Sequence, residues 1–113
     1  MFAKREVPAV KVSTLLPGVL DSIIRCISWP KSQRWGAQHE LFSRPVRWIV
    51  ALFGDEVIEF EYAGLKASRE TMGHRFMAPG PFAVADADKL LEVVRAAKVV
   101  PSHAQRETLI REQ

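Results

Sequence analysis

The chain has 113 residues and a mass of 12.7 kDa, which is enough for one domain with one hydrophobic core. Hydrophobic residues make up 48% of it and charged residues 26%, a balance that excludes an intrinsically disordered chain and a collagen-like repeat. The longest apolar run, 48–53, is too short to cross a bilayer, and no apolar stretch follows the charged N-terminus as in a secretory signal. We therefore expect a cytoplasmic domain with no membrane partner.

The charge distribution mildly favours an anionic partner. The chain carries a formal charge of +3 and has a pI near 9.4, within the range of nucleic-acid-binding domains. In its first part only Glu6, Asp21 and Glu40 oppose the basic residues, which are Lys4, Arg5, Lys11, Arg25, Lys31, Arg34, Arg44 and Arg47. The simplest interpretation of this run is a solvated face, and the alternative is a surface that meets phosphate groups.

The first expected element is an amphipathic helix over about 16–28. Ser13 or Thr14 is suited to cap its N-terminus, and Pro17 suits its first turn. Apolar residues recur there at intervals of three and four, at Leu16, Leu20, Ile23, Ile24 and Ile27. We expect the helix to end before Pro30, because the residue preceding a proline disfavours the helical conformation.

A β-hairpin is expected over about 46–62, after an aperiodic segment at 30–43 that predicts a loop or a short strand. Residues 46–53 are rich in β-branched and aromatic side chains, and Gly54 opens a short connection. Strict alternation from 57 to 62 then predicts a strand with one apolar face, formed by Ile58, Phe60 and Tyr62, and a second face formed by Val57, Glu59 and Glu61.

The second half predicts smaller elements. The polar segment 66–76 favours a third strand or an ordered loop, 78–81 a tight turn, and 82–84 a short strand. Asp86 is suited to cap a helix with an apolar stripe formed by Leu90, Leu91, Val94 and Ala97. Ser102 is suited to begin a last helix, which reaches Gln113 without a C-cap signal.

These patterns together predict a single α+β domain over 1–113. Its antiparallel or mixed sheet would be built on the hairpin at 46–62 and packed by helices. The last helix stops in mid-pattern, so we expect it to be truncated and the domain to be a fragment of a longer chain.

No catalytic constellation is expected in this chain. Cys26 lies within an apolar run on the expected helix, which favours a buried structural cysteine. The histidines His39, His74 and His103 are not spaced as metal ligands, and the six glycines form no phosphate-binding motif. We therefore predict neither catalytic residues nor a metal site.

Basic residues are interleaved with two tryptophans in a pattern that suits nucleic acid. Arg34 precedes Trp35, and Arg44 and Arg47 precede Trp48. Guanidinium groups pair with phosphate, and aromatic faces stack on unpaired bases. Alternation along a strand would place Trp48 in the core and Arg47 outside it, whereas Trp35 suits either environment.

Residues 73–76 form a second segment whose composition suits contact with an anionic ligand. Its glycine permits a close backbone approach or a positive φ, and His74 and Arg75 offer donors to an anion. The alternative is a hairpin corner that Phe76 anchors to the core.

Four short motifs follow one another with a familiar order and spacing. They are KSQRWG at 31–36, FSRPVRW at 42–48, GDEV at 54–57 and GHRFMAPG at 73–80. Together they resemble the N-terminal region of the β subunit of the bacterial-type heterotetrameric glycyl-tRNA synthetase. The family usually has Met where Gln33 stands. Its β subunit is several times longer, so the resemblance implies a fragment without the HD-like, body-tail and anticodon-binding regions.

The resemblance implies a place in glycyl-tRNA aminoacylation. The intact α2β2 enzyme uses ATP and magnesium, its active site lies on the α subunit, and the β subunit is concerned mainly with tRNA recognition. This region resembles the B3/4-type module of the phenylalanyl enzyme's β subunit. In that relative the module is associated with editing, but no editing residue matches a position here. The resemblance thus implies a fragment that is inactive alone and needs no cofactor.

Three hypotheses follow. In the first, the chain contributes to binding tRNA-Gly through Arg34, Trp35, Arg44, Arg47, His74 and Arg75. In the second, it is a structural domain that contacts the α subunit or the rest of the β subunit, which would show as an exposed apolar patch with Arg44 and Arg47 in internal ion pairs. In the third, it hydrolyses aminoacyl-tRNA and holds His74 or Cys26 in a polar cleft.

Overall fold

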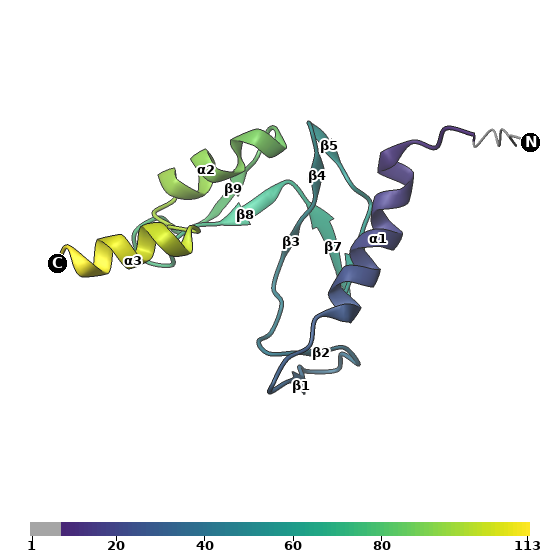
Figure 1. The fold of residues 1–113 in the computed structure, drawn as a ribbon, viewed down its shortest axis with the longest axis horizontal. Coiled ribbons are helices and arrows are strands. Elements are labelled where there is room, and N and C mark those ends of the chain that lie inside the picture. Colours follow the sequence, from purple (N-terminus) through teal and green to yellow (C-terminus); the bar gives the residue numbers. More distant parts are fainter. Residues whose placement is uncertain (1–7) are drawn as a thin grey trace, which may run out of the picture.

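The structure is a computed structural model and describes residues 8–113. Its helices are α1 (Val12–Cys26), α2 (Leu90–Ala96) and α3 (His103–Arg111), with a short 3-10 helix η1 (Ala87–Lys89) before α2. Its strands are β1 (Gln33–Arg34), β2 (Leu41–Phe42), β3 (Ile49–Val50), β4 (Leu52–Phe53), β5 (Glu56–Val57), β6 (Glu61–Tyr62), β7 (Leu65–Ser68), β8 (Glu70–Met72) and β9 (Pro81–Ala83). This mixture of helices and small sheets confirms the α+β class, while the likeness to a B3/4-type module stays an expectation (Figure 1).

Helix α1 begins four residues earlier than expected. Lys11 is the extended residue before it, and Thr14 lies in its first turn, where Oγ1 donates to the Lys11 carbonyl at 2.7 Å. The predicted cap at Ser13 or Thr14 is therefore wrong, because both residues already have helical backbone. Pro17 accordingly lies inside the helix, where it removes one backbone donor. The expected end before Pro30 is confirmed, since Ile27 is again extended.

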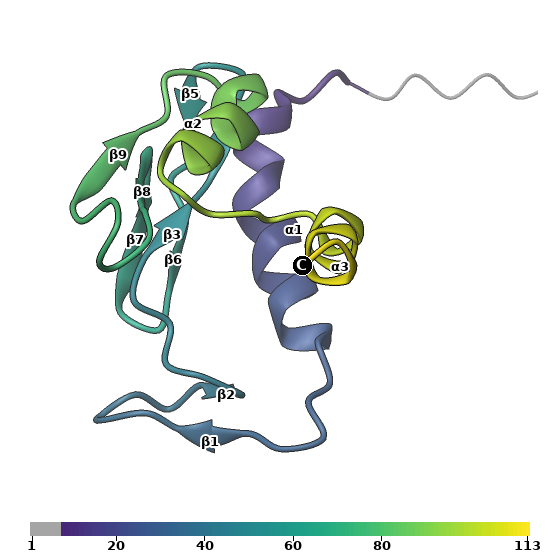
Figure 2. The ribbon, with the colours of Figure 1, turned by 90° about the vertical axis from the view of Figure 1, so that its left-hand side faces the viewer.

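The core lies between α1 and the segment that follows β5. Ile58, Phe60 and Tyr62 are buried, as the alternation predicts, whereas Glu59 and Glu61 are exposed. One side of α1 packs against this buried cluster through Leu16, Leu20 and Ile24. Figures 1 and 2 show α1 running alongside the central strands.

The predicted hairpin at 46–62 is correct at its turn and wrong beyond it. Strands β4 and β5 pair antiparallel across Gly54 and Asp55, and Gly54 has the positive φ of 62° that a type II′ turn requires at its first central position. One more bond follows, from the Ile58 amide to the Ala51 carbonyl at 2.9 Å, and the ladder then ends, because β3 pairs parallel with β7 and β6 pairs antiparallel with β7. The central sheet therefore has the order β3-β7-β6.

The β6–β7 connection explains why this second hairpin escapes sequence analysis. Both of its turn residues have positive φ, 52° at Ala63 and 70° at Gly64. These are the angles of a type I′ turn, whose first position is normally Asn, Asp or Gly. Because alanine is not typical of that position, the sequence gives no signal for the turn between β6 and β7.

Helix α1 and the central sheet form one layer of the fold. The second layer contains β8, β9, η1 and α2, which surround the fully buried Val84 and Ala97. The predicted caps are confirmed: Asp86 accepts the Asp88 amide at 2.9 Å, and Ser102 accepts the Gln105 amide at 3.3 Å. Leu91 is exposed rather than part of the apolar stripe. The stripe is therefore narrower than expected.

Arg69 joins the two layers between β7 and β8. Its guanidinium donates to the carbonyl of Asp55 at 3.1 Å and to that of Ala85 at 3.3 Å. The Ala87 amide adds a bond to the carbonyl of Gly54 at 2.8 Å. The tip of the β4–β5 hairpin is thereby tied to the start of the second layer.

The molecule is elongated. The described residues extend over 66 × 33 × 28 Å with a radius of gyration of 18.2 Å, compared with about 13 Å for a compact chain of this length. The β1–β2 hairpin lies at one end of the central sheet, and α3 projects away from it (Figures 1 and 2). Much apolar surface is consequently left in contact with solvent, including one side of α1.

Gly73 and Gly18 form a matched test of the packing. A Cβ at Gly73 would lie 2.6 Å from the Ala78 carbonyl oxygen and 2.9 Å from the Ala97 Cβ, whereas one at Gly18 meets nothing within 4 Å. We expect Gly73→Ala to lower the free energy of unfolding by about 1–3 kcal/mol through overpacking. Gly18→Ala should raise it by about 0.5–1 kcal/mol, since alanine favours the helix. Urea denaturation measures both changes, and equal stability of the two variants would contradict this packing.

Candidate nucleic-acid interface

The six candidate residues lie on two separate loop regions. Arg34 ends β1, Trp35 follows it, and Arg44 and Arg47 lie on the irregular segment between β2 and β3. His74 and Arg75 belong to the turn between β8 and β9. The first four residues thus surround one end of the central sheet, and the other two lie in the second layer.

Trp35 is partly a structural residue. Its indole Nε1 donates to the carbonyl of Phe42 at 3.0 Å, which joins the two sides of the β1–β2 hairpin. It also lines a cavity of about 350 Å³ together with Tyr62 and Glu40. Burial raises the pKa of the Tyr62 phenol, with a further contribution from Glu40. Trp35 is therefore half-buried against the core.

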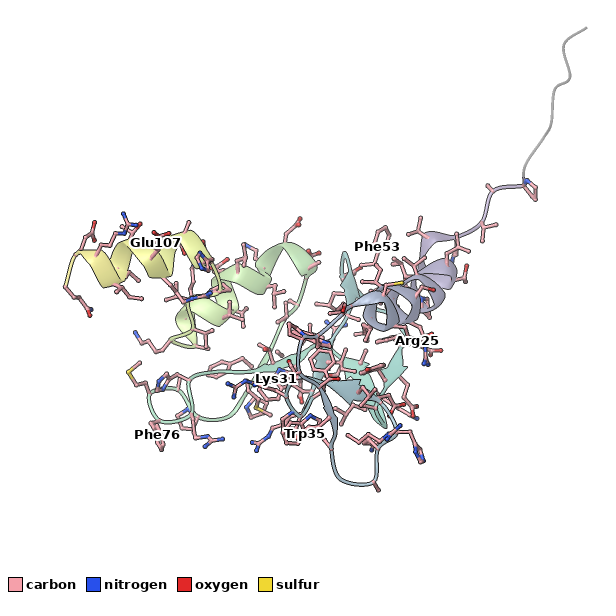
Figure 3. The ribbon with its side chains drawn as sticks, turned by 60° about the horizontal axis from the view of Figure 1, so that its bottom comes forward. Arg25, Lys31, Trp35, Phe53, Phe76 and Glu107 are labelled. Carbon is pink, nitrogen blue, oxygen red and sulfur yellow. The ribbon has the colours of Figure 1, made fainter. Side chains whose placement is uncertain are left out.

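The arginines near Trp35 are more accessible. Arg34 is exposed and its Nε donates to the His39 carbonyl at 3.3 Å. Arg44 and Arg47 are exposed too, and neither takes part in the ion pairs formed within residues 8–113. Figure 3 shows Lys31 on the same side of the hairpin region as Trp35. This end of the sheet therefore presents several cationic groups to solvent.

Trp48 is not the core residue that alternation predicted. Its exposed fraction is 44%. The alternation rule fails because β3 begins only at Ile49, and the irregular chain from Arg44 to Trp48 has no regular pleat to orient side chains. Trp48 is therefore an accessible aromatic group beside Arg47, and sequence analysis missed it.

The turn after β8 has a well-defined internal structure. The His74 amide donates to the Ala97 carbonyl at 2.9 Å, and the Ala78 amide donates to the His74 carbonyl at 2.9 Å. The His74 ring Nδ1 accepts the amides of Phe76 at 3.3 Å and Met77 at 3.1 Å. His74 therefore organises the turn, and its Nδ1 acts there as an acceptor rather than as a donor to an anion.

The expected anchoring of this corner by Phe76 is wrong. The exposed fractions are 83% for Phe76 and 64% for Met77, and Figure 3 shows Phe76 at the outer edge of the turn. Gly73 and His74 anchor the corner instead, through the close approach of Gly73 to Ala97 and the backbone bonds of His74. The turn is thus free to present Phe76 and Met77 to solvent beside the exposed Arg75.

The expected burial of Cys26 is also wrong. Cys26 is exposed at the last position of α1, because the buried side of that helix is the one formed by Leu16, Leu20 and Ile24. Within residues 8–113 no group of His, Cys, Asp and Glu side chains is arranged to hold a metal ion. In the same range no helix has the length and apolar character to cross a bilayer.

Comparison with known proteins relates this α+β chain to a subunit of an aminoacyl-tRNA synthetase. The family described as "Glycyl-tRNA synthetase beta subunit" matches residues 1–113, the whole length of the chain. The chain belongs to that family.

Three curated relatives illustrate the similarity, and each is a glycine–tRNA ligase beta subunit. The one from Moorella thermoacetica is 46% identical over 113 residues, the one from Xylella fastidiosa strain M12 is 42% identical over 104, and the one from Syntrophomonas wolfei is 34% identical over 113. These alignments cover 100%, 92% and 100% of the chain. They span only 16%, 14% and 16% of the relatives' own lengths.

Replacing His74 tests its role in the turn. We expect His74→Ala to speed amide hydrogen exchange at Phe76 and Met77 by about fivefold, because both amides lose their acceptor and a hydrogen bond contributes about 1 kcal/mol. His74→Asn is the control, since an asparagine side chain accepts amides two residues ahead in the same way. Unchanged exchange in His74→Ala would show that the ring does not hold the turn.

Proposed function

We propose that this chain is a non-catalytic module of a glycyl-tRNA synthetase β subunit and contributes to binding tRNA-Gly. The intact enzyme joins glycine to its tRNA with ATP and magnesium, and the module works there together with the α subunit and the rest of the β subunit. The observation that carries the proposal is the exposed set Arg44, Arg47 and Trp48 on the irregular segment before β3.

The local charge supports an anionic ligand. Between residues 31 and 54, four basic residues and one acidic residue give a net charge of +3. All four basic residues, Lys31, Arg34, Arg44 and Arg47, are exposed. The acidic residue, Glu40, is half-buried, and its charge contributes to raising the pKa of Tyr62 and that of Arg25. The positive field is therefore concentrated on solvent-facing groups, where a phosphate backbone would meet it.

The exposed tryptophan adds a contact suited to RNA. Stacking of a base on an aromatic side chain contributes about 1–3 kcal/mol, and arginines beside it pair with the flanking phosphates. Trp48 lies next to Arg47 in the chain and provides such a surface. This combination supports a nucleic-acid ligand over a simple inorganic anion.

The test is the binding of fluorescently labelled tRNA-Gly, followed by anisotropy at low and near-physiological salt. We expect the double variant Arg44→Glu, Arg47→Glu to bind at least tenfold more weakly and to reduce the slope of log affinity against log salt by about 2, since each phosphate contact contributes about 1. Arg95→Glu, Arg111→Glu is the matched control with the same change in charge on α2 and α3. Equal affinity of the two double variants would refute the proposal.

A second candidate function is assembly, and the exposed side of α1 favours it. Val12, Leu15, Val19 and Ile23 follow one another at intervals of three and four, so they form a stripe along one side of the helix. Each is about half exposed, with values from 48% to 54%. We call this set the α1 stripe. A helix that is apolar on two sides is normally covered on both, and the relatives' subunits are about six times longer than this chain.

A charge in the α1 stripe should block assembly without changing tRNA affinity. We expect the tagged variant Leu15→Glu, Ile23→Glu to lose co-purification with the α subunit and the remaining β-subunit segment of the Moorella thermoacetica relative. The control Thr14→Glu, Gly18→Glu places the same charges on exposed positions on another side of α1, where a side chain at Gly18 meets nothing within 4 Å, and should be retained. Retention of both variants would exclude the α1 stripe as an assembly surface.

A further inference from the structure

The turn formed by residues 73–78 exposes apolar side chains that contribute little to the fold. Phe76 is the most exposed of the large hydrophobic residues within 8–113, at 83%, and its neighbour in the chain, Met77, is 64% exposed. Keeping such side chains in water gains none of the free energy that burial would provide. Contact with another molecule therefore explains these exposed side chains better than packing within the fold does.

The turn is held by specific contacts although its apolar side chains are exposed. Gly73 approaches Ala97 so closely that a Cβ would overlap it, and the His74 amide bonds to the carbonyl of the same alanine. The His74 ring then accepts the amides of Phe76 and Met77. A surface that is ordered before binding loses less conformational entropy when it binds. Phe76 and Met77 are thus held ready for a ligand.

The charge around the turn is positive. Arg75 is exposed, and no acidic residue occurs between Glu70 and Asp86 in the sequence. Lys98 is exposed as well and directly follows Ala97, the residue to which the turn is bonded. A ligand that contacts Phe76 therefore meets the neighbouring Arg75 and no carboxylate from this stretch of chain.

The size of the surface distinguishes a nucleotide from a protein. Two side chains offer at most about 200 Å² each, whereas a specific protein interface buries about 800 Å² on each partner. A single base stacked on one ring needs no larger surface. The rings of His74 and Phe76 lie 6.3 Å apart at an angle of 57°, so Phe76 is supported on that side.

We propose that the 73–78 turn receives one unpaired RNA nucleotide, whose base stacks on Phe76 beside Met77 and whose phosphate pairs with Arg75. This inference rests on the proposed tRNA function and extends it to a second contact, distinct from the one at Arg44 and Arg47. His74 is a positioning residue in this site. The ligand class is single-stranded RNA, because a base inside a duplex has both faces covered by the bases stacked on it.

The test uses the chain with a 12-nucleotide single-stranded RNA that carries one 2-aminopurine, and with the same RNA in a duplex. We expect quenching of the 2-aminopurine on binding, and a loss of affinity in Phe76→Ala of between about fivefold and a hundredfold. Phe76→Trp should retain the affinity because it keeps an aromatic face. Phe76→Leu is the matched control that keeps an apolar side chain and should bind as weakly as Phe76→Ala. Binding of the duplex should be the same in all four proteins.

The outcomes separate this inference from the proposed function. If Phe76→Ala and Phe76→Leu keep full affinity while Arg44→Glu, Arg47→Glu loses it, the stacking site is refuted and the tRNA function stands. If the unsubstituted chain binds no RNA even at low salt, both are refuted. If Phe76→Leu binds RNA normally and Phe76→Ala instead loses co-purification with the α subunit, the turn is a protein contact and the inference is overturned. Equal thermal unfolding of the variants confirms that each is folded.

Discussion

The packing of α1 on the strand segment 57–62 is the contact on which the rest of the structure depends. Ile58, Phe60 and Tyr62 are the buried side of that segment, and they receive Leu16, Leu20 and Ile24 from the helix. Few other hydrophobic residues are buried within 8–113, and those lie around Val84 and Ala97 in the second layer. Because each buried side chain of this size contributes about 1.5–3 kcal/mol, this small cluster supports loops that bury little themselves.

Local signals in the sequence predict local structure well and long-range pairing poorly. The alternation around Phe60 and the caps at Asp86 and Ser102 depend on neighbouring residues, and the structure confirms them. The parallel pairing of β3 with β7 joins segments about 18 residues apart and leaves no periodic trace. The wrong placements of Trp48 and Phe76 have one cause, since a strand or an anchored corner was assumed where the chain is irregular.

Membership of the glycyl-tRNA synthetase β-subunit family gives these exposed groups a common context. The chain covers 14–16% of its relatives, so a surface that is open here can be covered in a longer subunit. The α1 stripe is apolar and uncharged, whereas the regions around Arg44 and Arg75 combine cations with aromatic rings. The three surfaces therefore differ in chemistry. The α1 stripe suits a protein neighbour, whereas the regions around Arg44 and Arg75 suit RNA.

Arg69 has a consequence for how the two regions that we propose as RNA contacts would act together. It ties the β4–β5 tip to the second layer while its own chain continues from β7 into β8, so the two regions belong to one frame. A fixed spacing turns the second contact into an intramolecular event with a high effective concentration. An RNA whose shape matches that spacing gains avidity, and one that reaches only a single region does not. The fixed spacing would thus select RNA molecules by the distance between their two contact points rather than by the identity of their bases.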